Sequence, residues 1–429
     1  MKRYISLILA AFMAVSLTAC QTASGLFHNN LSPESSTQVS EVGEDDVRVG
    51  FIFPYGSDSP DTISHVAAIR RMQQAVGLSD SQIDIVRNVS SKDYADQIEK
   101  LISQGCDLIF AKKSDAENAM IEAAKNHPEV EFCQEDGRKA EDSGLSNMHN
   151  FYVRLYQGYY AAGVAAGVKL NSMLNEGKIY SETCVAGFAA ASENPENISS
   201  INAFTLGVRR VCYQARVLVR YVGKVGDYDA DGECARQLIA AGAHLMCQRV
   251  FTNAVAVVCA ENDIPVVGNE TNIIDVAPSE AITSVTADWS VYYEYAVSCL
   301  LNGKEIDTDW CAGYKENAVV LSQFNDAHLA EGTIEKVVEV EQELRSGRAK
   351  VYDTTTFTVN GETLENLVKS DSAFKKFKKL VANGEFKESR NSSAPKMNFL
   401  IDGVQLADEN YLPEEETTEE GEETSQAEQ

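Results

Sequence analysis

Two successive series of short apolar runs and amphipathic segments constrain the fold of this chain more than any other feature. The first series covers 47–132 and the second covers 183–268. In both, apolar runs of strand length alternate with helical patterns of roughly ten to fifteen residues, a spacing that indicates parallel strands joined by crossover helices. Such sheets carry helices on both faces. We therefore expect an α/β protein with two doubly wound parallel-sheet lobes.

The segment at 150–170, NFYVRLYQGYYAAGVAAGVKL, lies between the two series. It begins as an alternating apolar run and continues as a helix whose small residues allow close packing against a neighbour. Its uncharged part, 155–168, contains three glycines and is shorter than the roughly twenty apolar residues that a bilayer span needs. We interpret it as a structural helix at the passage from one lobe to the other.

Later apolar runs at 282–286 and 318–324 are needed to complete the sheets. The chain should therefore cross between lobes three times, near 151–155, near 285–288 and near 320, and these crossings form a hinge. Lobe 1 is expected to comprise 47–154 with 286–320, and lobe 2 to comprise 155–285 with 321–350. Ligands of open α/β folds bind beyond the carboxyl ends of the strands, here in a cleft between the lobes.

The first residues have the form of a bacterial lipoprotein signal. Lys2 and Arg3 precede an apolar run that ends in Leu-Thr-Ala-Cys at 17–20. We expect a signal peptide at 1–19, a mature chain lipidated on Cys20 and held on the extracytoplasmic face of the cell membrane, and a flexible tether at 20–46. An ordinary signal peptide with an incidental cysteine is the alternative.

The last part of the chain changes character. Residues 351–412 are interpreted as a C-terminal extension that begins with a β-hairpin turning at Asn360-Gly361. A basic helix at 371–383 and a strand at 398–403 should follow, and the acidic segment 413–429 is typical of a disordered tail.

Charge and cysteine content exclude several classes of protein. The formal net charge of −27 disfavours nucleic acid as a partner. Besides Cys20, nine cysteines are scattered singly, mostly within apolar runs, without the CxxC spacing of a zinc site. Buried free thiols are the interpretation, with one or two disulfides left open. The sequence also lacks GxSxG, HExxH, P-loop and GxGxxG motifs, so we expect neither an enzyme nor a cofactor.

Several longer motifs occur in a fixed order from 47 to about 361. They are CDLIFA at 106–111, HPEVEFC at 127–133, INAFTLGVRRV at 201–211, QLIAAGAHLMCQ at 237–248 and DWSVYY at 288–293. In these the chain resembles the basic membrane protein (BMP) family. The resemblance implies a substrate-binding lipoprotein of an ABC importer, with the type I periplasmic-binding fold, an ABC permease as partner and, as for many members, a purine nucleoside as ligand. The extension resembles that of a clostridial-type branch.

The resemblance implies a set of candidate ligand-binding residues, and the chain departs from the family around them. Val225 replaces an expected tryptophan, Arg249 stands where histidine is common, and Lys112 and Lys113 occupy a loop where small polar residues are usual. The candidate residues are Tyr55, Asp58, Asp61, Lys113, Phe188, Glu196, Asp227, Arg249, Asp288 and Trp289.

These residue types suit a nucleoside. Tyr55, Phe188 and Trp289 could offer aromatic faces to a base, and Asp227 or Asp288 could accept both hydroxyl protons of a ribose. The alternatives are structural: a helix cap at Asp61, a strand end at Asp227 and a core position for Trp289. Lysine and arginine side chains pointing inward would favour an anionic ligand. A sensing or adhesion lipoprotein with the same fold is the alternative function.

Overall fold

The computed structural model describes residues 47–112, 116–389 and 395–407, which all belong to the compact unit Glu41–Gln429. Five predictions lie outside the described residues: the signal peptide, lipidation of Cys20, the tether, the role of Lys113 and the acidic tail.

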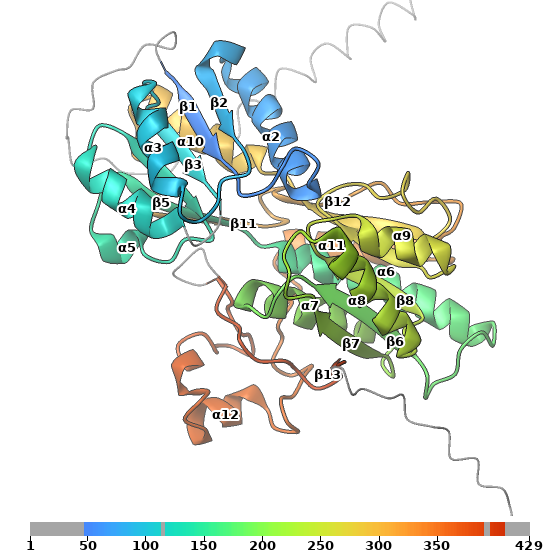
Figure 1. The fold of residues 1–429 in the computed structure, drawn as a ribbon. Coiled ribbons are helices and arrows are strands. Elements are labelled where there is room, and N and C mark those ends of the chain that lie inside the picture. Colours follow the sequence, from blue (N-terminus) through green and yellow to red (C-terminus); the bar gives the residue numbers. More distant parts are fainter. Residues whose placement is uncertain (1–46, 113–115, 390–394, 408–429) are drawn as a thin grey trace, which may run out of the picture. The chain divides into compact units, whose positions relative to one another are not determined.

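Lobe 1 is built on a six-stranded sheet in which all neighbouring strands are parallel, in the order β11-β5-β4-β3-β1-β2 (Figure 1). Runs such as VGFI and LIFA form strands buried along their whole length, as a sheet covered on both faces requires. The strands are β1 (Val49–Ile52), β2 (Ile83–Val86), β3 (Leu108–Ala111), β4 (Glu131–Glu135), β5 (Met148–Val153) and β11 (Asp309–Ala312). The helices are α2 (Pro60–Val76), α3 (Tyr94–Ser103), α4 (Glu117–Asn126), α5 (Ala140–Ser143) and α10 (Ser290–Leu301).

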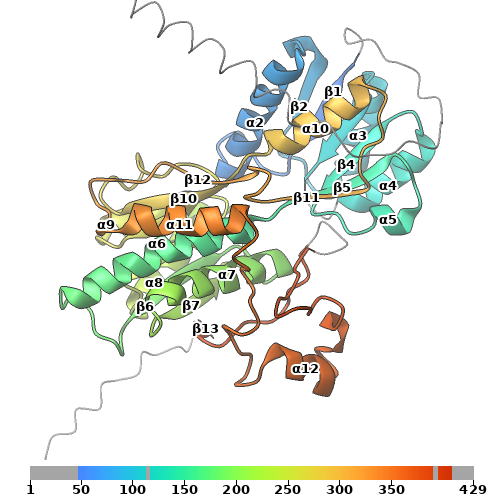
Figure 2. The same ribbon diagram turned by 180° about the vertical axis from the view of Figure 1, so that it is seen from behind.

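Lobe 2 is built on a seven-stranded sheet in the order β12-β10-β9-β8-β6-β7-β13, parallel except for β12 (Figure 2). Its strands are β6 (Val185–Ala190), β7 (Arg216–Tyr221), β8 (Leu245–Arg249), β9 (Val266–Asn269), β10 (Ala281–Ala287), β12 (Val319–Leu321) and β13 (Val404–Leu406). Its helices are α6 (Leu155–Asn175), α7 (Pro195–Val211), α8 (Tyr228–Ala240), α9 (Ala254–Glu261) and α11 (Thr333–Arg345). Two doubly wound parallel-sheet lobes confirm the predicted fold class.

The small-residue segment became α6, which packs against α7 at very short range. A Cβ atom added to Gly163 would lie 2.3 Å from the carbonyl oxygen of Phe204, and one added to Gly207 would lie 2.0 Å from that of Tyr160. Backbone cannot move aside as a flexible side chain can, so glycine is required at this contact.

The chain passes between the two sheets after β5, after β10 and after β11. The structure shortens the second segment of lobe 1, predicted at 286–320, at both ends. Strand β10 extends to Ala287 and β12 begins at Val319, and both strands belong to the sheet of lobe 2. Strand β11 was not predicted from the sequence. It is a short edge strand, buried only at Ala312, and therefore has no continuous apolar run to signal it.

The extension follows its predicted turn but not its predicted elements. Asn360 and Gly361 have φ values of 53° and 77°, and Val359 bridges Glu362 across them, which confirms the turn. The helix prediction at 371–383 is wrong: α12 (Leu364–Ser370) ends earlier, and only the 3-10 turn Lys375–Phe377 follows. The strand prediction at 398–403 is also wrong, because the strand β13 begins at Val404, where it pairs with β7.

Tertiary packing explains both errors in the extension. The rings of Phe374 and Phe377 pack on Phe399, with centroids 5.3 and 5.2 Å away, and Phe377 also packs on Phe386 at 5.7 Å. This aromatic cluster joins segments that are distant in sequence, and such contacts override local helix propensity.

Candidate ligand-binding site

A cavity of about 350 Å³ lies where the carboxyl ends of strands from both lobes meet, within the size range of small-molecule sites. Its lining contains five carboxylate and three cationic side chains, together with aromatic rings. The charged and aromatic residues of this lining are Tyr55, Asp61, Lys112, Glu135, Asp136, Arg138, Glu196, Arg249, Phe251, Glu270 and Trp289.

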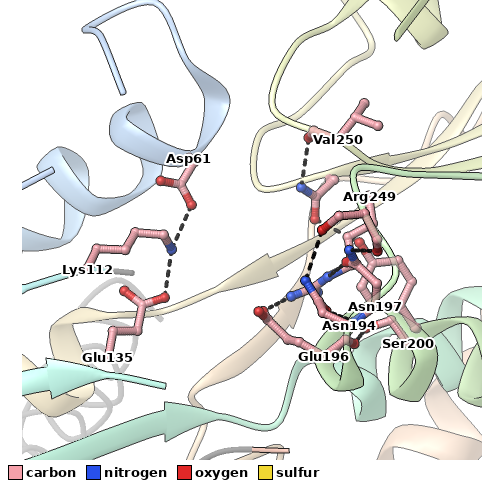
Figure 3. A network of polar contacts seen from close by, with 12 residues as sticks. Asp61, Lys112, Glu135, Asn194, Glu196, Asn197, Ser200, Arg249 and Val250 are labelled. Atoms are coloured by element: carbon pink, nitrogen blue, oxygen red, sulfur yellow. Dashed lines mark hydrogen bonds and ion pairs between the residues drawn. The ribbon is translucent and has the colours of Figure 1, made fainter. Parts of the chain in front are cut away.

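In lobe 1 the central charge is Lys112, which directly follows β3. Its Nζ lies 2.8 Å from Asp61 Oδ1, 2.6 Å from Glu135 Oε1 and 3.1 Å from His65 Nε2, as Figure 3 shows for the two carboxylates. An ammonium group has three protons, so these three contacts use all of its donors. Burial opposes the charge on Lys112, but Asp61 and Glu135 outweigh it and hold the pKa well above its usual range.

His65 completes this cluster in its neutral form. Complete burial, with Lys112 beside it, lowers the pKa of His65 well below its usual value. Because Nε2 accepts from Lys112, Nδ1 carries the proton and donates it to the Tyr293 hydroxyl at 2.7 Å. Lys112 therefore has no donor left for a ligand, whereas Asp61 keeps a buried Oδ2 without a partner among the described residues.

Trp289 is packed into the same cluster. Only 2% of it is exposed, its ring stacks on His65 with centroids 4.5 Å apart, and Lys112 Nζ lies 5.3 Å from its centroid. Its indole Nε1 is buried and has no hydrogen-bond partner among the described residues. A ring buried to this degree cannot offer a face to a ligand, so the group that Trp289, a lining residue, has left is its unpartnered indole N–H.

In lobe 2 the corresponding cation is Arg249, the last residue of β8. Its Nε donates to Asn197 Oδ1 at 2.9 Å, and its Nη2 pairs with Glu196 (Figure 3). Both partners lie in the first turn of α7, whose N-cap Asn194 accepts from the Asn197 N–H at 2.8 Å. The buried Nη1 of Arg249 finds no partner in the described chain, so this guanidinium keeps the two N–H donors of Nη1 for a ligand.

Two carboxylates with left-handed backbones face the same cavity. Asp136 follows β4 with φ of 55°, and Glu270 follows β9 with φ of 64°. Non-glycine residues rarely adopt this conformation, and it is concentrated at functional sites. Asp136 Oδ1 and Glu270 Oε2 are buried without a partner in the described part of the chain. Burial raises the pKa of Glu270 to about 7, and it also raises that of Asp136.

Five predicted site residues do line the cavity. Tyr55 contacts Phe251 of the other lobe, with ring centroids 4.5 Å apart. The five are Tyr55, Asp61, Glu196, Arg249 and Trp289.

The structure does not bring the other four described candidates to the cavity. Phe188 is fully buried in the core, 5.7 Å from Tyr159 and 5.6 Å from Phe204 between ring centroids. Asp58 is exposed in the loop after β1. The remaining two, Asp227 and Asp288, are structural and are described next.

Both aspartates proposed for the ribose hold helix starts: Asp227 as an N-cap, and Asp288 one residue before the N-cap of α10. Asp227 is the N-cap of α8 and accepts from the Ala230 N–H at 3.0 Å. Asp288 accepts from the N–H and hydroxyl of Ser290 and pairs with Arg71 at 2.8 Å. An aspartate before a helix satisfies free backbone N–H groups, and this local role explains both positions.

Six charged or aromatic lining residues were not among the predicted ones: Lys112, Arg138, Phe251 and the three carboxylates Glu135, Asp136 and Glu270. The three carboxylates share a position. Each ends or directly follows a buried strand, in the runs FCQED and VVGNE. The rule that ligands bind at the carboxyl ends of parallel strands was therefore a usable signal.

The described residues contain no group of three or more potential metal ligands placed to hold an ion. No helix among them has both the length and the apolar character needed to cross a bilayer.

The fold and this cavity define a class of protein. Two parallel-sheet lobes joined by three passages, with a charged cavity at their strand ends, form the type I periplasmic-binding fold. A solved ABC transporter solute-binding protein of Aeropyrum pernix K1 shares it, with a TM-score of 0.58 and 16% identity over 76% of this chain and 98% of that one. Residues 47–355 match the family model of PnrA-like ABC transporter substrate-binding proteins (Bmp), and the chain belongs to this family.

Two curated relatives carry ligand names. A purine-binding protein of Brucella abortus is 27% identical over 331 residues, covering 75% of this chain and 90% of its own. A candidate ABC transporter glucose-binding protein of Haloferax volcanii, TsgA13, is 24% identical over 287 residues, covering 67% and 68%. Family membership makes this chain a substrate-binding protein and not an enzyme: it binds a small solute for an ABC transporter and works with a permease.

Proposed function

We propose that the solute is a purine nucleoside, delivered from this cavity to an ABC permease. The observation that carries the proposal is a mixed set of buried polar atoms that have no partner among the described residues and that belong to residues lining the cavity. Three are carboxylate acceptors and two are donors: Asp61 Oδ2, Asp136 Oδ1, Glu270 Oε2, Arg249 Nη1 and Trp289 Nε1. A buried polar atom is costly unless it is bonded, so a ligand should supply the missing partners.

A nucleoside has the complementary groups. Ribose hydroxyls and the amino or ring N–H groups of a purine donate, which suits the carboxylates of Asp136 and Glu270. Ring nitrogens and carbonyl oxygens accept, which suits Arg249 Nη1 and Trp289 Nε1. Tyr55 and Phe251 add aromatic surface to the wall.

Charge argues against a phosphorylated ligand. Lys112 and Arg249 do point into the cavity, but Lys112 is paired with Asp61 and Glu135, and Arg249 is paired with Glu196. Carboxylates outnumber cations in the lining, so a phosphate would meet net repulsion. This pairing removes the main reason to expect an anionic solute. The Brucella abortus relative named for purines supports the purine, while the Haloferax volcanii relative keeps a sugar as the competitor.

Calorimetric titration tests the proposal. Adenosine, guanosine and inosine should be compared with adenosine monophosphate, glucose and a mixture of amino acids. We expect heat from at least one nucleoside and none from the phosphate ester. Glu270→Gln should weaken nucleoside binding at least about tenfold, since a hydrogen bond to a charged group contributes about 1.5–3 kcal/mol. Asp227→Asn, outside the cavity, is the matched control and should bind as the wild type does. Binding of glucose or an amino acid alone would contradict the nucleoside.

We further infer that the chain is anchored through a lipid on Cys20, supported by the Leu-Thr-Ala-Cys junction after an apolar segment. Metabolic labelling with palmitate should mark the wild type and not Cys20→Ala. Equal labelling of both chains would contradict the anchor.

A further inference from the structure

Two cysteines of lobe 2 come into direct contact. The Sγ atoms of Cys184 and Cys212 lie 3.4 Å apart, and neither residue is exposed to solvent. Within the described residues this is the one sulfur–sulfur contact. Other buried cysteines have different neighbours; Cys133, for example, accepts from the Tyr292 hydroxyl at 3.2 Å. The pair is therefore distinct from the thiols that simply fill the core.

The backbone holds both cysteines in place. Cys184 directly precedes β6, and its carbonyl accepts from the Arg216 N–H at 3.0 Å. Cys212 is the C-cap of α7: its N–H donates to the Val208 carbonyl at 2.8 Å, and its own carbonyl accepts from the Ala215 N–H at 3.1 Å. A disulfide needs a sulfur–sulfur distance of about 2.05 Å, so the two sulfurs must approach by only ~1.4 Å. Side-chain rotation can supply an approach of this size.

We propose that Cys184 and Cys212 form a structural disulfide in the exported protein, joining the end of α7 to the start of β6. Substrate-binding proteins of ABC importers act outside the cytoplasm, where disulfides form and persist. The bridge would close a loop between positions 28 apart in sequence. Constraining the unfolded chain in this way stabilises the folded lobe.

The oxidant is a protein disulfide of the export compartment, acting by thiol–disulfide exchange. The Cys212 thiolate attacks one sulfur of that disulfide, forms a mixed disulfide and releases one thiolate. Cys184 then loses its proton and attacks the Cys212 sulfur, which breaks the mixed disulfide and releases the second thiolate. The two cysteines lose two electrons and two protons, and the external disulfide becomes a dithiol.

The contact also sets the order of these steps. A hydrogen bond from the Cys184 thiol lowers the pKa of Cys212, which favours Cys212 as the first nucleophile. Because both thiols are buried in the folded lobe, the exchange takes place late in folding, after the end of α7 and the start of β6 have met and before the pair is covered.

Mass spectrometry of the exported full chain tests the bridge directly. The protein is unfolded in an alkylating agent without reductant, digested, and compared with a reduced sample. We expect a cross-linked peptide pair containing Cys184 and Cys212 that disappears on reduction, and two fewer alkylated cysteines before it. Alkylation of both cysteines in the unreduced sample, or a cross-link to a different cysteine, would overturn the proposal. This measurement needs no variant to fold.

Thermal unfolding supplies a second measurement. Reductant should lower the wild-type midpoint by about 5 °C, the size expected for losing a bridge of this loop length. A double variant, Cys184→Ser with Cys212→Ser, should show no response to reductant. Cys133→Ser is the control and should keep the full response. A wild-type midpoint that does not change on reduction would contradict a stabilising bridge.

Discussion

Lobe 1 and lobe 2 repeat the same arrangement of charge around the cavity but satisfy it differently. The strand orders β11-β5-β4-β3-β1-β2 and β12-β10-β9-β8-β6-β7 correspond position by position. At equivalent places each lobe has an acid after a helix-starting proline, a cation at the end of its third strand and a left-handed carboxylate after its fourth. These are Asp61, Lys112 and Asp136 in lobe 1, and Glu196, Arg249 and Glu270 in lobe 2.

The two lobes differ in how many N–H donors of the cation remain without a partner. All three donors of Lys112 bond Asp61, Glu135 and His65. Arg249 bonds Glu196 and Asn197, and its Nη1 has no partner among the described residues. A lysine is a compact charge that two carboxylates can enclose, and an arginine fork has donors in several directions. We infer that the lobe 1 cluster serves mainly to organise the cavity wall, while lobe 2 supplies the cation that contacts the ligand.

We expect the largest effect, a loss of unfolding free energy, from a substitution that breaks the lobe 1 cluster. Lys112→Met leaves Asp61 and Glu135 buried without their cation, which should cost about 3–5 kcal/mol of unfolding free energy. Urea denaturation measures the loss. Lys125→Met is the matched control, because Lys125 meets Glu122 at 3.4 Å on the surface and such pairs contribute at most about 1 kcal/mol. Equal losses in both variants would show that the cluster has no structural role.

A change in lobe 2 should affect binding more than stability. Arg249→Lys keeps a charge for Glu196 but loses the fork that also bonds Asn197 and reaches the cavity. We expect calorimetry to show binding weakened about 10- to 100-fold, since one charged hydrogen bond contributes about 1.5–3 kcal/mol. Arg236→Lys, at an exposed pair with Glu233, should leave affinity unchanged. Unweakened binding in Arg249→Lys would remove the distinction between the two cations.

The left-handed carboxylate of lobe 2, Glu270, should make the stability of the protein depend on pH. Burial raises the pKa of Glu270 to about 7 in the folded chain, above the 4.5 expected when it is unfolded. The folded state therefore holds more protons between about pH 4.5 and 7, and the stability that Glu270 contributes is lost as pH rises through this window. Glu270→Gln lacks this loss.

The free energy of unfolding of Glu270→Gln relative to wild type should therefore rise from pH 4.5 to pH 7, by on the order of 2 kcal/mol. Denaturation series at matched pH values measure this difference. Glu233→Gln is the exposed control and should give a flat difference. A flat difference for Glu270→Gln as well would mean that its carboxylate is solvated in the folded protein.

The fold was predictable where local pattern and tertiary burial agree. Buried runs such as CDLIF and LMCQ mark central strands, because only a strand covered on both faces is continuously apolar. The extension failed for the opposite reason: the position of Phe377 is decided by Phe386 and Phe399, which no local period reports. Sequence pattern reports on residues that are close along the chain, whereas the extension is held by contacts between residues that are distant in sequence.

Only some residues of the site could be predicted from the sequence. Family positions led to Asp61 and Arg249, yet they also led to Phe188, whose ring is in the core. Asp136 and Glu270 were missed because an acid after a strand is usually solvated, whereas these two are desolvated and lie among charges from both lobes. Which lobe faces which residue is a property of the three passages, not of any one segment.

The smallest expected effect concerns an aspartate just outside the cavity. Asp227 caps α8 through the Ala230 N–H, so Asp227→Ala should lower the free energy of unfolding by about 1 kcal/mol, the usual contribution of an N-cap. Asp227→Asn keeps a capping oxygen and should be nearly neutral. Neither change removes a polar atom from the cavity, so the nucleoside affinity of both variants should stay within about twofold of wild type, which corresponds to less than about 0.5 kcal/mol. Urea denaturation and calorimetric titration on the same preparations separate the two quantities.

If Asp227→Ala lost affinity and Asp227→Asn kept it, the helix cap would be needed to hold the cavity residues in place. If both lost affinity, Asp227 itself would contact the ligand, and the division between cavity carboxylates and capping carboxylates would have to be redrawn.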